Sequence, residues 1–135
     1  MEKIVFEVMG NPKALKRHRT GKFCNYDPSM QDKQDFLILA HNNRPSMPID
    51  GPLKIDIEFC FARPKNHYGS GKNSKILKPG CGLWHIARPD TDNLIKFVCD
   101  SLNGVFFKDD SQLCEIRAVK KYSEKPRTIV IIERA

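Results

Sequence analysis

Acidic residues gather in one short stretch of a chain that is otherwise basic. The 135-residue sequence has 23 lysine and arginine residues against 16 aspartate and glutamate residues, a formal net charge of +7. Residues 88–112, RPDTDNLIKFVCDSLNGVFFKDDSQ, nevertheless hold Asp90, Asp92, Asp100, Asp109 and Asp110. Carboxylates that lie close together repel one another, so a cluster of them usually requires a cation. The stretch therefore predicts a metal site in a protein whose charge suits a polyanionic partner.

The spacing of this stretch places acidic and basic groups on one face of a helix. Asp92, Lys96 and Asp100 recur at intervals of four along a helix predicted over residues 91–103. Asp90 precedes this helix, and a short turn followed by an apolar segment could carry the Asp109–Asp110 pair back beside it. Carboxylates are hard oxygen ligands for Mg²⁺ or Mn²⁺, ions that activate water and stabilise charge in phosphodiester hydrolysis. A lysine beside them can stabilise the charged phosphate.

Each of these residues also has an ordinary structural interpretation. An aspartate at the start of a helix is often only a cap that the helix dipole favours. Asp92, Lys96 and Asp100 could form surface ion pairs worth about 0.2–0.5 kcal/mol each. The Asp109–Asp110 pair could simply form a turn. The combination of all five aspartates with basic loops in one short chain favours the metal-site interpretation.

Hydrophobic periodicity predicts a single α+β domain over residues 1–135, a small mixed β-sheet with two main helices packed on it. Strands are expected over residues 3–9, 52–62, 113–122 and 128–133, with residues 123–127 as a hairpin turn between the last two. The first helix is expected over residues 29–43, begun by a capping box of Ser29 and Asp32. Residues 10–28 are expected to form a basic loop, and residues 63–88 a long irregular one, which in a small domain is usually functional or mobile.

Several classes of protein are disfavoured by the sequence. No apolar run is long enough to span a membrane, and the first residues do not resemble a signal peptide, so a cytoplasmic protein is expected. The five cysteines include no CxxC pair, which favours reduced thiols over a zinc site. The segment GSGKNS, residues 69–74, lacks residues that a phosphate-binding loop requires at Asn66 and Asn73, so no nucleotide cofactor is expected.

The acidic stretch resembles the signature of RusA-type Holliday-junction resolvases, small endodeoxyribonucleases of bacteria and their prophages. The shared elements are an Asp-x-Asp-Asn-Leu-x-Lys run, an aspartate four residues past the lysine, and an Asp-Asp-x-Gln group after a short turn. The chain start is also similar, with a strand that ends in Gly-x-Pro and a basic loop, KALKRHR. The resemblance covers the first strand and the region from about residue 52 to the end.

The resemblance implies a Mg²⁺-dependent homodimer, with Mn²⁺ as a substitute, that nicks four-way DNA junctions symmetrically in recombination and repair. It implies Asp90, Asp92 and Asp110 as metal ligands and Lys96 as the catalytic lysine. Asp100 is expected either to support these residues from beside the site or to form a contact on the helix face, and Asp109 either to support them or only to shape the turn. Two sets of basic residues are expected to contact the phosphates of branched DNA. The first loop supplies Lys13, Lys16, Arg17 and Arg19, and the second supplies Lys72, Lys75 and Lys78.

Two other functions are compatible with parts of this pattern. A non-catalytic nucleic-acid-binding protein could keep the same fold, although carboxylates near phosphates weaken pure binding. A small metabolic enzyme could use Mg²⁺ with a phosphorylated substrate, although the chain has no recognisable phosphate loop. His85 and the neighbouring Trp84 are further candidates near the acidic stretch, the first as a site residue and the second as a base-stacking surface.

Overall fold

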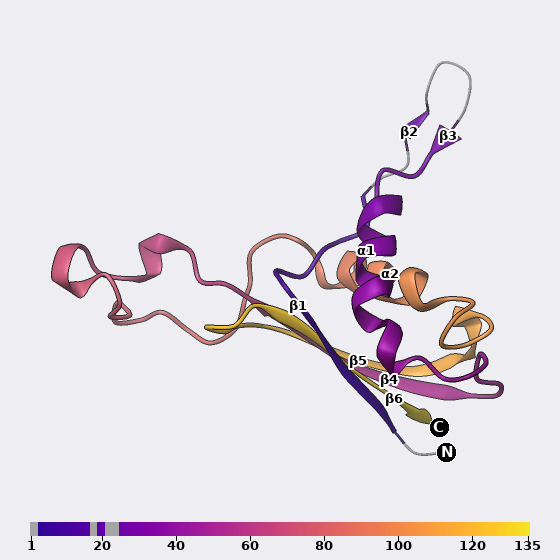
Figure 1. The fold of residues 1–135 in the computed structure, drawn as a ribbon. Coiled ribbons are helices and arrows are strands. Elements are labelled where there is room, and N and C mark those ends of the chain that lie inside the picture. Colours follow the sequence, from indigo (N-terminus) through magenta and orange to yellow (C-terminus); the bar gives the residue numbers. More distant parts are fainter. Residues whose placement is uncertain (1–2, 17–18, 21–24) are drawn as a thin grey trace.

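A four-stranded mixed sheet with two helices on one face forms the body of the molecule (Figure 1). The computed structural model describes residues 3–16, 19–20 and 25–135, without the side chains of residues 19, 20 and 25. The sheet order is β1-β6-β4-β5, in which β4 runs parallel to β5 and antiparallel to β6. The strands span Ile4–Met9 (β1), Leu53–Phe61 (β4), Leu113–Tyr122 (β5) and Arg127–Arg134 (β6). This architecture confirms the predicted α+β fold.

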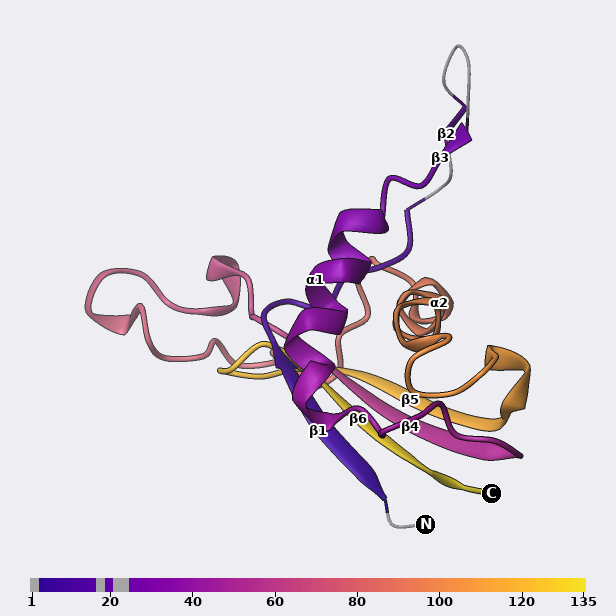
Figure 2. The ribbon, with the colours of Figure 1, turned by 45° about the vertical axis from the view of Figure 1, so that its right-hand side comes forward.

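Alternation along β4 builds the centre of the core. The residues of β4 that face the helices are all buried, and their neighbours Lys54, Asp56 and Glu58 on the other face are half-buried. β6 is also interior, since it lies between β1 and β4, as its apolar sequence predicts. The helices α1 (Met30–Ala40) and α2 (Thr91–Leu102) cover the same face of the sheet and lie side by side (Figure 2).

The boundaries of α2 follow from its sequence. Asp90 occupies the N-cap position with extended backbone, and an apolar stripe that includes Leu94, Phe97 and Val98 is buried against the sheet. The helix ends at Leu102, and Gly104 follows with a φ of +82°, a conformation that glycine adopts without strain. The predicted helix over residues 91–103 is therefore confirmed to within one residue.

The first helix differs from its prediction at both ends. The α-helix ends at Ala40, and residues His41–Asn43 form a separate 3₁₀ turn, η1. The predicted capping box is wrong, because the Ser29 hydroxyl accepts a hydrogen bond from the Lys16 amide at 2.7 Å instead of capping the helix. The Asp32 carboxylate lies within 4 Å of the ammonium groups of Lys13 and Lys16, so contacts from a distant segment replace the local cap.

The described residues of the segment 10–28 include some regular structure instead of a plain loop. Two short strands, β2 (Arg19–Thr20) and β3 (Asn25–Tyr26), pair antiparallel within this segment. The backbone of Leu15 also donates to the carbonyl oxygen of Asn93 at 3.1 Å, which fixes the segment against the start of α2. Main-chain pairing of this kind depends little on side-chain pattern, which explains why the sequence shows no strand here.

The predicted hairpin between the last two strands is wrong. β5 and β6 are consecutive in sequence, but β4 lies between them in the sheet. Residues 123–126 therefore cross the end of β4, and the Ser123 amide donates to the Phe61 carbonyl oxygen at 2.9 Å there. β4 has the most deeply buried apolar face, so placing it between two neighbours satisfies both of its edges.

Residues 63–83 leave the sheet as a long arm (Figure 1, pink). The arm contains two 3₁₀ turns, η2 (Lys65–His67) and η3 (Gly71–Asn73), and a bridge between Tyr68 and Leu77. Of the cysteines in the described ranges, Cys60 and Cys99 are buried and none forms a disulfide. No helix among the described residues is long and apolar enough to cross a membrane.

Candidate functional site

The first turns of α2 carry three charged side chains that point into solvent. Asp90 stands at the N-cap but makes no side-chain capping bond, and Asp92 and Lys96 follow on the exposed side of the helix. Within the described part of the chain, none of these three side chains forms an ion pair or a hydrogen bond. The alternative that Asp92, Lys96 and Asp100 are paired along the helix surface is therefore wrong for the described structure.

The backbone before Asp90 is held by a lysine from the sheet. The Lys120 ammonium on β5 donates to the carbonyl oxygens of Ala87 and Pro89, each at 2.8 Å. A hollow of about 510 Å³ lies beside this loop, between the start of α2 and the segment of Ala14 and Leu15. Its lining includes Asp90, so the hollow gives a ligand direct access to the first carboxylate.

Asp110 is positioned by a small cap of its own. It begins the 3₁₀ turn η4 (Asp110–Gln112), where Asp109 accepts from the Ser111 amide at 3.1 Å and Gln112 accepts from the Asp109 amide at 2.9 Å. The hydrogen bonds from Ser111 lower the pKa of the Asp109 carboxyl. The Gln112 side chain also donates to the carbonyl oxygens of Ile49 and Gly51, which fixes the turn to the start of β4. Asp109 thus shapes the turn, and the Asp110 side chain remains exposed without an ion pair among the described residues.

The chain after α2 returns beside the helix, as predicted. Burial, together with the nearby charges of Asp110 and Asp100, raises the pKa of the Cys99 thiol to about 12. Cys99 lies on the third turn of α2, so this effect indicates that the Asp110 carboxylate is near that turn.

Asp100 has a structural partner on the other helix. Its carboxylate lies 3.5 Å from the Lys33 ammonium of α1, which is also 2.7 Å from the carboxylate of Asp27. Burial lowers the pKa of Lys33, but the two carboxylates outweigh this effect and the net pKa is raised. Asp100 therefore joins α2 to α1, a role that accounts for its charge without a metal ion.

The donor chemistry fits Mg²⁺, but the described structure does not gather a closed set of ligands. Among residues 3–16, 19–20 and 25–135, no group of three or more His, Cys, Asp or Glu side chains could hold a metal ion. Mg²⁺ commonly keeps several waters and binds through one or two carboxylates plus a substrate phosphate. Asp90 and Asp92, two residues apart at the exposed end of α2, match this open kind of site.

His85 lies near the site in sequence but is part of the core. Its ring stacks on Phe61 at a centroid distance of 4.0 Å and contacts Tyr122 at 5.1 Å. Burial lowers the pKa of His85, and the neighbouring charge of Lys120 lowers it further. The residue therefore fills the space below the loop that leads to Asp90, while Trp84 is 59% exposed beside it.

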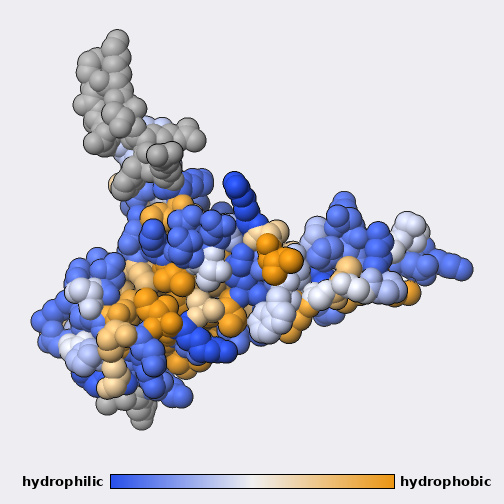
Figure 3. All heavy atoms as spheres, turned by 180° about the vertical axis from the view of Figure 1, so that it is seen from behind, coloured by the Kyte–Doolittle hydropathy of each residue, from blue (hydrophilic) through white to orange (hydrophobic). Residues whose placement is uncertain are grey.

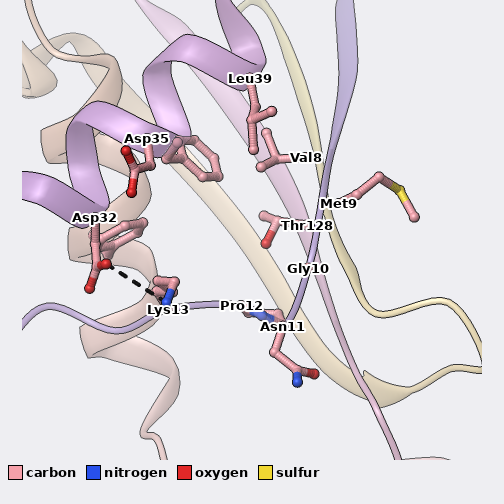
Figure 4. Close-up of a pocket in the computed structure, with 12 residues that line it drawn as sticks. Val8, Met9, Gly10, Asn11, Pro12, Lys13, Asp32, Asp35, Leu39 and Thr128 are labelled. Carbon is pink, nitrogen blue, oxygen red and sulfur yellow. Dashed lines mark ion pairs between the residues drawn. The ribbon is translucent and has the colours of Figure 1, made fainter.

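The predicted basic residues fall into two groups with different surroundings. Lys13 and Lys16 are exposed, yet both reach the carboxylate of Asp32, and Lys13 borders a pocket of about 270 Å³ between β1 and α1 (Figure 4). Arg17 lies outside the described residues, as does the side chain of Arg19. Lys72, Lys75 and Lys78 are exposed on the arm and form no ion pair with any other described residue. The pocket of Figure 4 includes none of the aspartates of residues 88–112.

Sequence reasoning missed the residues that hold the site in place. Lys120 lies on the same side of β5 as Ile116 and Ala118. Its charge in this otherwise apolar row was the only sequence feature that could have indicated its role. Gln112 was part of the Asp-Asp-x-Gln group, but its two bonds to the chain before β4 join residues 61 and 63 positions apart. No sequence pattern indicated the pairing of Lys33 with Asp100.

Comparison with known proteins identifies the family. A family model, endodeoxyribonuclease RusA, matches residues 6–133. A Bacillus subtilis (strain 168) protein, the uncharacterized protein YqaN, is 36% identical over 138 residues, which cover 98% of this chain and 96% of the relative. The crossover junction endodeoxyribonuclease rusA of Lactococcus phage r1t is 27% identical over 110 residues, which cover 79% of this chain and 75% of the relative. With a match over nearly its whole length, the chain belongs to the RusA family of endodeoxyribonucleases.

Proposed function

We propose that this protein is a Mg²⁺-dependent endonuclease that resolves four-way DNA junctions by paired symmetric nicks, in DNA recombination and repair. The observation that carries the proposal is that three of the five aspartates have no side-chain partner among the described residues. Asp90, Asp92 and Asp110 are exposed and unpaired among the described residues, whereas Asp100 and Asp109 have structural partners. Family membership and the phage relative, a crossover junction endodeoxyribonuclease, support the same substrate.

The residues of this chain have distinct roles in the proposed reaction. Asp90 and Asp92 would hold the ion together with a phosphate of the DNA, and Asp110 would be a further ligand from the turn that follows α2. Bound there, Mg²⁺, or Mn²⁺ in its place, would activate water and stabilise charge on the phosphodiester. Lys96, one helical turn after Asp92, contacts the phosphate and stabilises the charge that develops on it. No nucleophile from the protein is required.

Binding of the DNA depends on the basic residues around this site. Lys13 and Lys16, with Arg17 and Arg19 of the same segment, contact phosphates next to the hollow that contains Asp90. Such contacts supply affinity and orientation without reading the base sequence. The ion pairs of Lys13 and Lys16 with Asp32 span 3.6–3.7 Å on exposed side chains, so exchange for a phosphate costs little.

Two matched nicks call for two copies of the site, which a twofold dimer supplies. The described strands support such an assembly, because β1 and β5 each have a neighbour on one side only. Large hydrophobic side chains are also exposed, among them Ile38 at 69% and Leu39 at 58% on α1. Figure 3 shows further hydrophobic residues gathered on the face opposite to that of Figure 1.

The proposal is tested by cleavage of a mobile synthetic four-way junction, with Mg²⁺ and with EDTA. The wild type is expected to make paired symmetric nicks in Mg²⁺ alone, and Asp92→Asn to bind the junction without cutting it. Asp35→Asn is the matched control, since Asp35 is an exposed helical aspartate and an amide still accepts the bond from Gln31. If the wild type binds the junction tightly but makes no nick in Mg²⁺, the result would support the non-catalytic binding protein instead.

A further inference from the structure

The arm, residues 63–83, carries charged side chains of one sign only. The chain has no aspartate or glutamate between Glu58 and Asp90. The arm itself carries five basic residues, Arg63, Lys65, Lys72, Lys75 and Lys78. No residue of the arm lines the hollow beside Asp90 or belongs to the described core. The arm extends well beyond the sheet (Figure 1).

Hydrogen bonds within the arm give it a defined shape. The Gly69 amide donates to the Ile76 carbonyl oxygen at 3.0 Å, and the Lys78 amide donates to that of His67 at 2.8 Å. These bonds join the outgoing and returning limbs across the bridge of Tyr68 and Leu77. The arm therefore projects from the sheet with a defined backbone shape, which fixes the positions of its side chains relative to one another.

The base of the arm is anchored on the strand that also holds the candidate site. The Arg63 guanidinium lies 4.9 Å from the ring centroid of Tyr122, and the His67 ring meets the same ring edge-on at 5.0 Å. The Tyr122 amide donates to the Leu83 carbonyl oxygen at 2.8 Å. Because Lys120, two residues earlier on β5, fixes the loop before Asp90, arm and site have a common support.

The returning limb exposes an apolar pair between two lysines. In the sequence Lys75-Ile76-Leu77-Lys78, Ile76 is 60% exposed and Leu77 is 44% exposed. Figure 3 shows the arm as mainly hydrophilic, with a few hydrophobic residues at its surface. Lysines with apolar side chains between them are the combination by which proteins contact the minor groove of DNA.

We propose that the arm binds a DNA duplex along its minor groove, away from the point of cleavage. Lys72, Lys75 and Lys78 contact phosphates, and Ile76 and Leu77 pack against the sugars of the groove. The inference rests on the proposed function, because it takes DNA as the substrate. It adds a second contact, which makes the affinity for a junction depend on the length of its duplex arms. The absence of acidic residues favours DNA over a protein surface, which would present mixed charges.

The reach of the arm sets the length of DNA that it requires. Seven residues, 64–70, lie between Arg63 at the base and η3, and an extended chain of that length spans at most about 25 Å. DNA rises 3.4 Å per base pair, so the contact lies within roughly seven base pairs of the body. A junction whose arms are much shorter than this offers the body a branch point but gives the arm little duplex to hold.

The experiment compares junctions with arms of 4 and 20 base pairs, each closed by a hairpin loop, with affinities measured in EDTA. The arm variants are K72A/K75A/K78A and I76S/L77S, which leave Arg63, His67 and Tyr122 intact. The controls are K3A/K54A/K108A, which removes equal charge from ion-paired lysines of the body, and M47S, at a methionine that is 71% exposed. Circular dichroism checks that each variant is folded.

The inference predicts that the lysine variant loses tenfold or more in affinity for the long-arm junction and less than twofold for the short-arm one. Its salt dependence on the long-arm junction falls by about 2–3 in the slope of log affinity against log salt. I76S/L77S is expected to lose about threefold and to lose hydroxyl-radical protection of sugars on the duplex. The controls are expected to bind like the wild type.

Equal losses on both junctions, or equal losses in the controls, would overturn the inference. It would also be overturned if the arm variants bound DNA normally but no longer bound anionic phospholipid vesicles, since the partner would then be a lipid surface. Failure of the proposed function gives a different result: arm-dependent binding of long duplex arms persists, with no Mg²⁺-dependent nick by the wild type.

Discussion

The Lys120 ammonium on β5 donates to the Pro89 carbonyl oxygen at 2.8 Å, immediately before the residue that begins the acidic site. A second bond of equal length reaches Ala87, so one side chain from an edge strand fixes the backbone on which Asp90 stands. The position of the first carboxylate therefore depends on the sheet as well as on α2.

Replacing Lys120 should impair the site more than the fold. Lys120→Met removes both bonds, and we expect cleavage to fall about tenfold or more with a loss of about 1–2 kcal/mol in the free energy of unfolding. Lys120→Arg should recover part of the activity. The neighbouring Lys121→Met, which removes only a pair with Glu58, should cleave normally, and equal losses in the two Met variants would contradict this role.

Asp100 and Asp92 should separate stability from activity. Asp100→Asn weakens the contact with Lys33 and should cost about 1 kcal/mol of stability while cleavage continues. Asp92→Asn should abolish cleavage with little change in stability, since Asp92 has no partner among the described residues. Urea unfolding and junction cleavage of both variants would check this, and loss of cleavage in a folded Asp100→Asn would place that carboxylate in the reaction.

The role of Gln112 can be tested by a substitution that keeps the hydrogen bond it accepts and removes the two that it donates. Gln112→Glu keeps an acceptor for the Asp109 amide but places oxygen against the carbonyl oxygens of Ile49 and Gly51. We expect a loss of about 2 kcal/mol in stability and slower cleavage, because the turn that carries Asp110 is released from β4. Thermal unfolding of Gln112→Glu beside Glu115→Gln, an exposed substitution on β5, measures the effect, and equal melting temperatures would disprove it.

His85 should make stability fall in mild acid. Its pKa in the folded protein lies below the ordinary value of 6.5, so the unfolded chain binds the proton more readily. The stabilisation is complete above pH 6.5 and is lost as the pH falls below this value toward the folded pKa. His85→Phe, whose ring can still stack on Phe61, should reduce the loss of stability between pH 7 and pH 5, as measured by urea unfolding. An unchanged pH profile would show that other groups cause it.

The open arrangement of the carboxylates predicts weak metal binding without DNA. Because no three acidic side chains form a cluster in the described residues, Mg²⁺ alone should raise the melting temperature by less than about 1 °C. Mg²⁺ affinity should rise tenfold or more when the inactive Lys96→Gln variant, which keeps all three proposed ligands, is loaded with a junction, because a phosphate then completes the ligand set. Isothermal calorimetry with and without DNA distinguishes this from a preformed site, which would bind Mg²⁺ equally in both.

The sequence by itself determined the elements of the fold and the identity of the candidate residues. The five apolar alternations of β4 and the stripe of α2 arise from local periodicity, which depends only on neighbours in the chain. The Asp-x-Asp-Asn-Leu-x-Lys run indicated Asp90, Asp92 and Lys96 by type and spacing. The family followed from the same residues.

Only the tertiary structure decided which of the five aspartates already had partners. Asp100 is paired by Lys33 from another helix, and the turn of Asp110 is tied by Gln112 to residues more than 60 positions away. Insertion of β4 between β5 and β6 likewise depends on burial of the apolar face and pairing of both edges of one strand, which no local pattern records. Long-range contacts of this kind arise from packing, and they separate the free carboxylates of the site from those that hold the fold together.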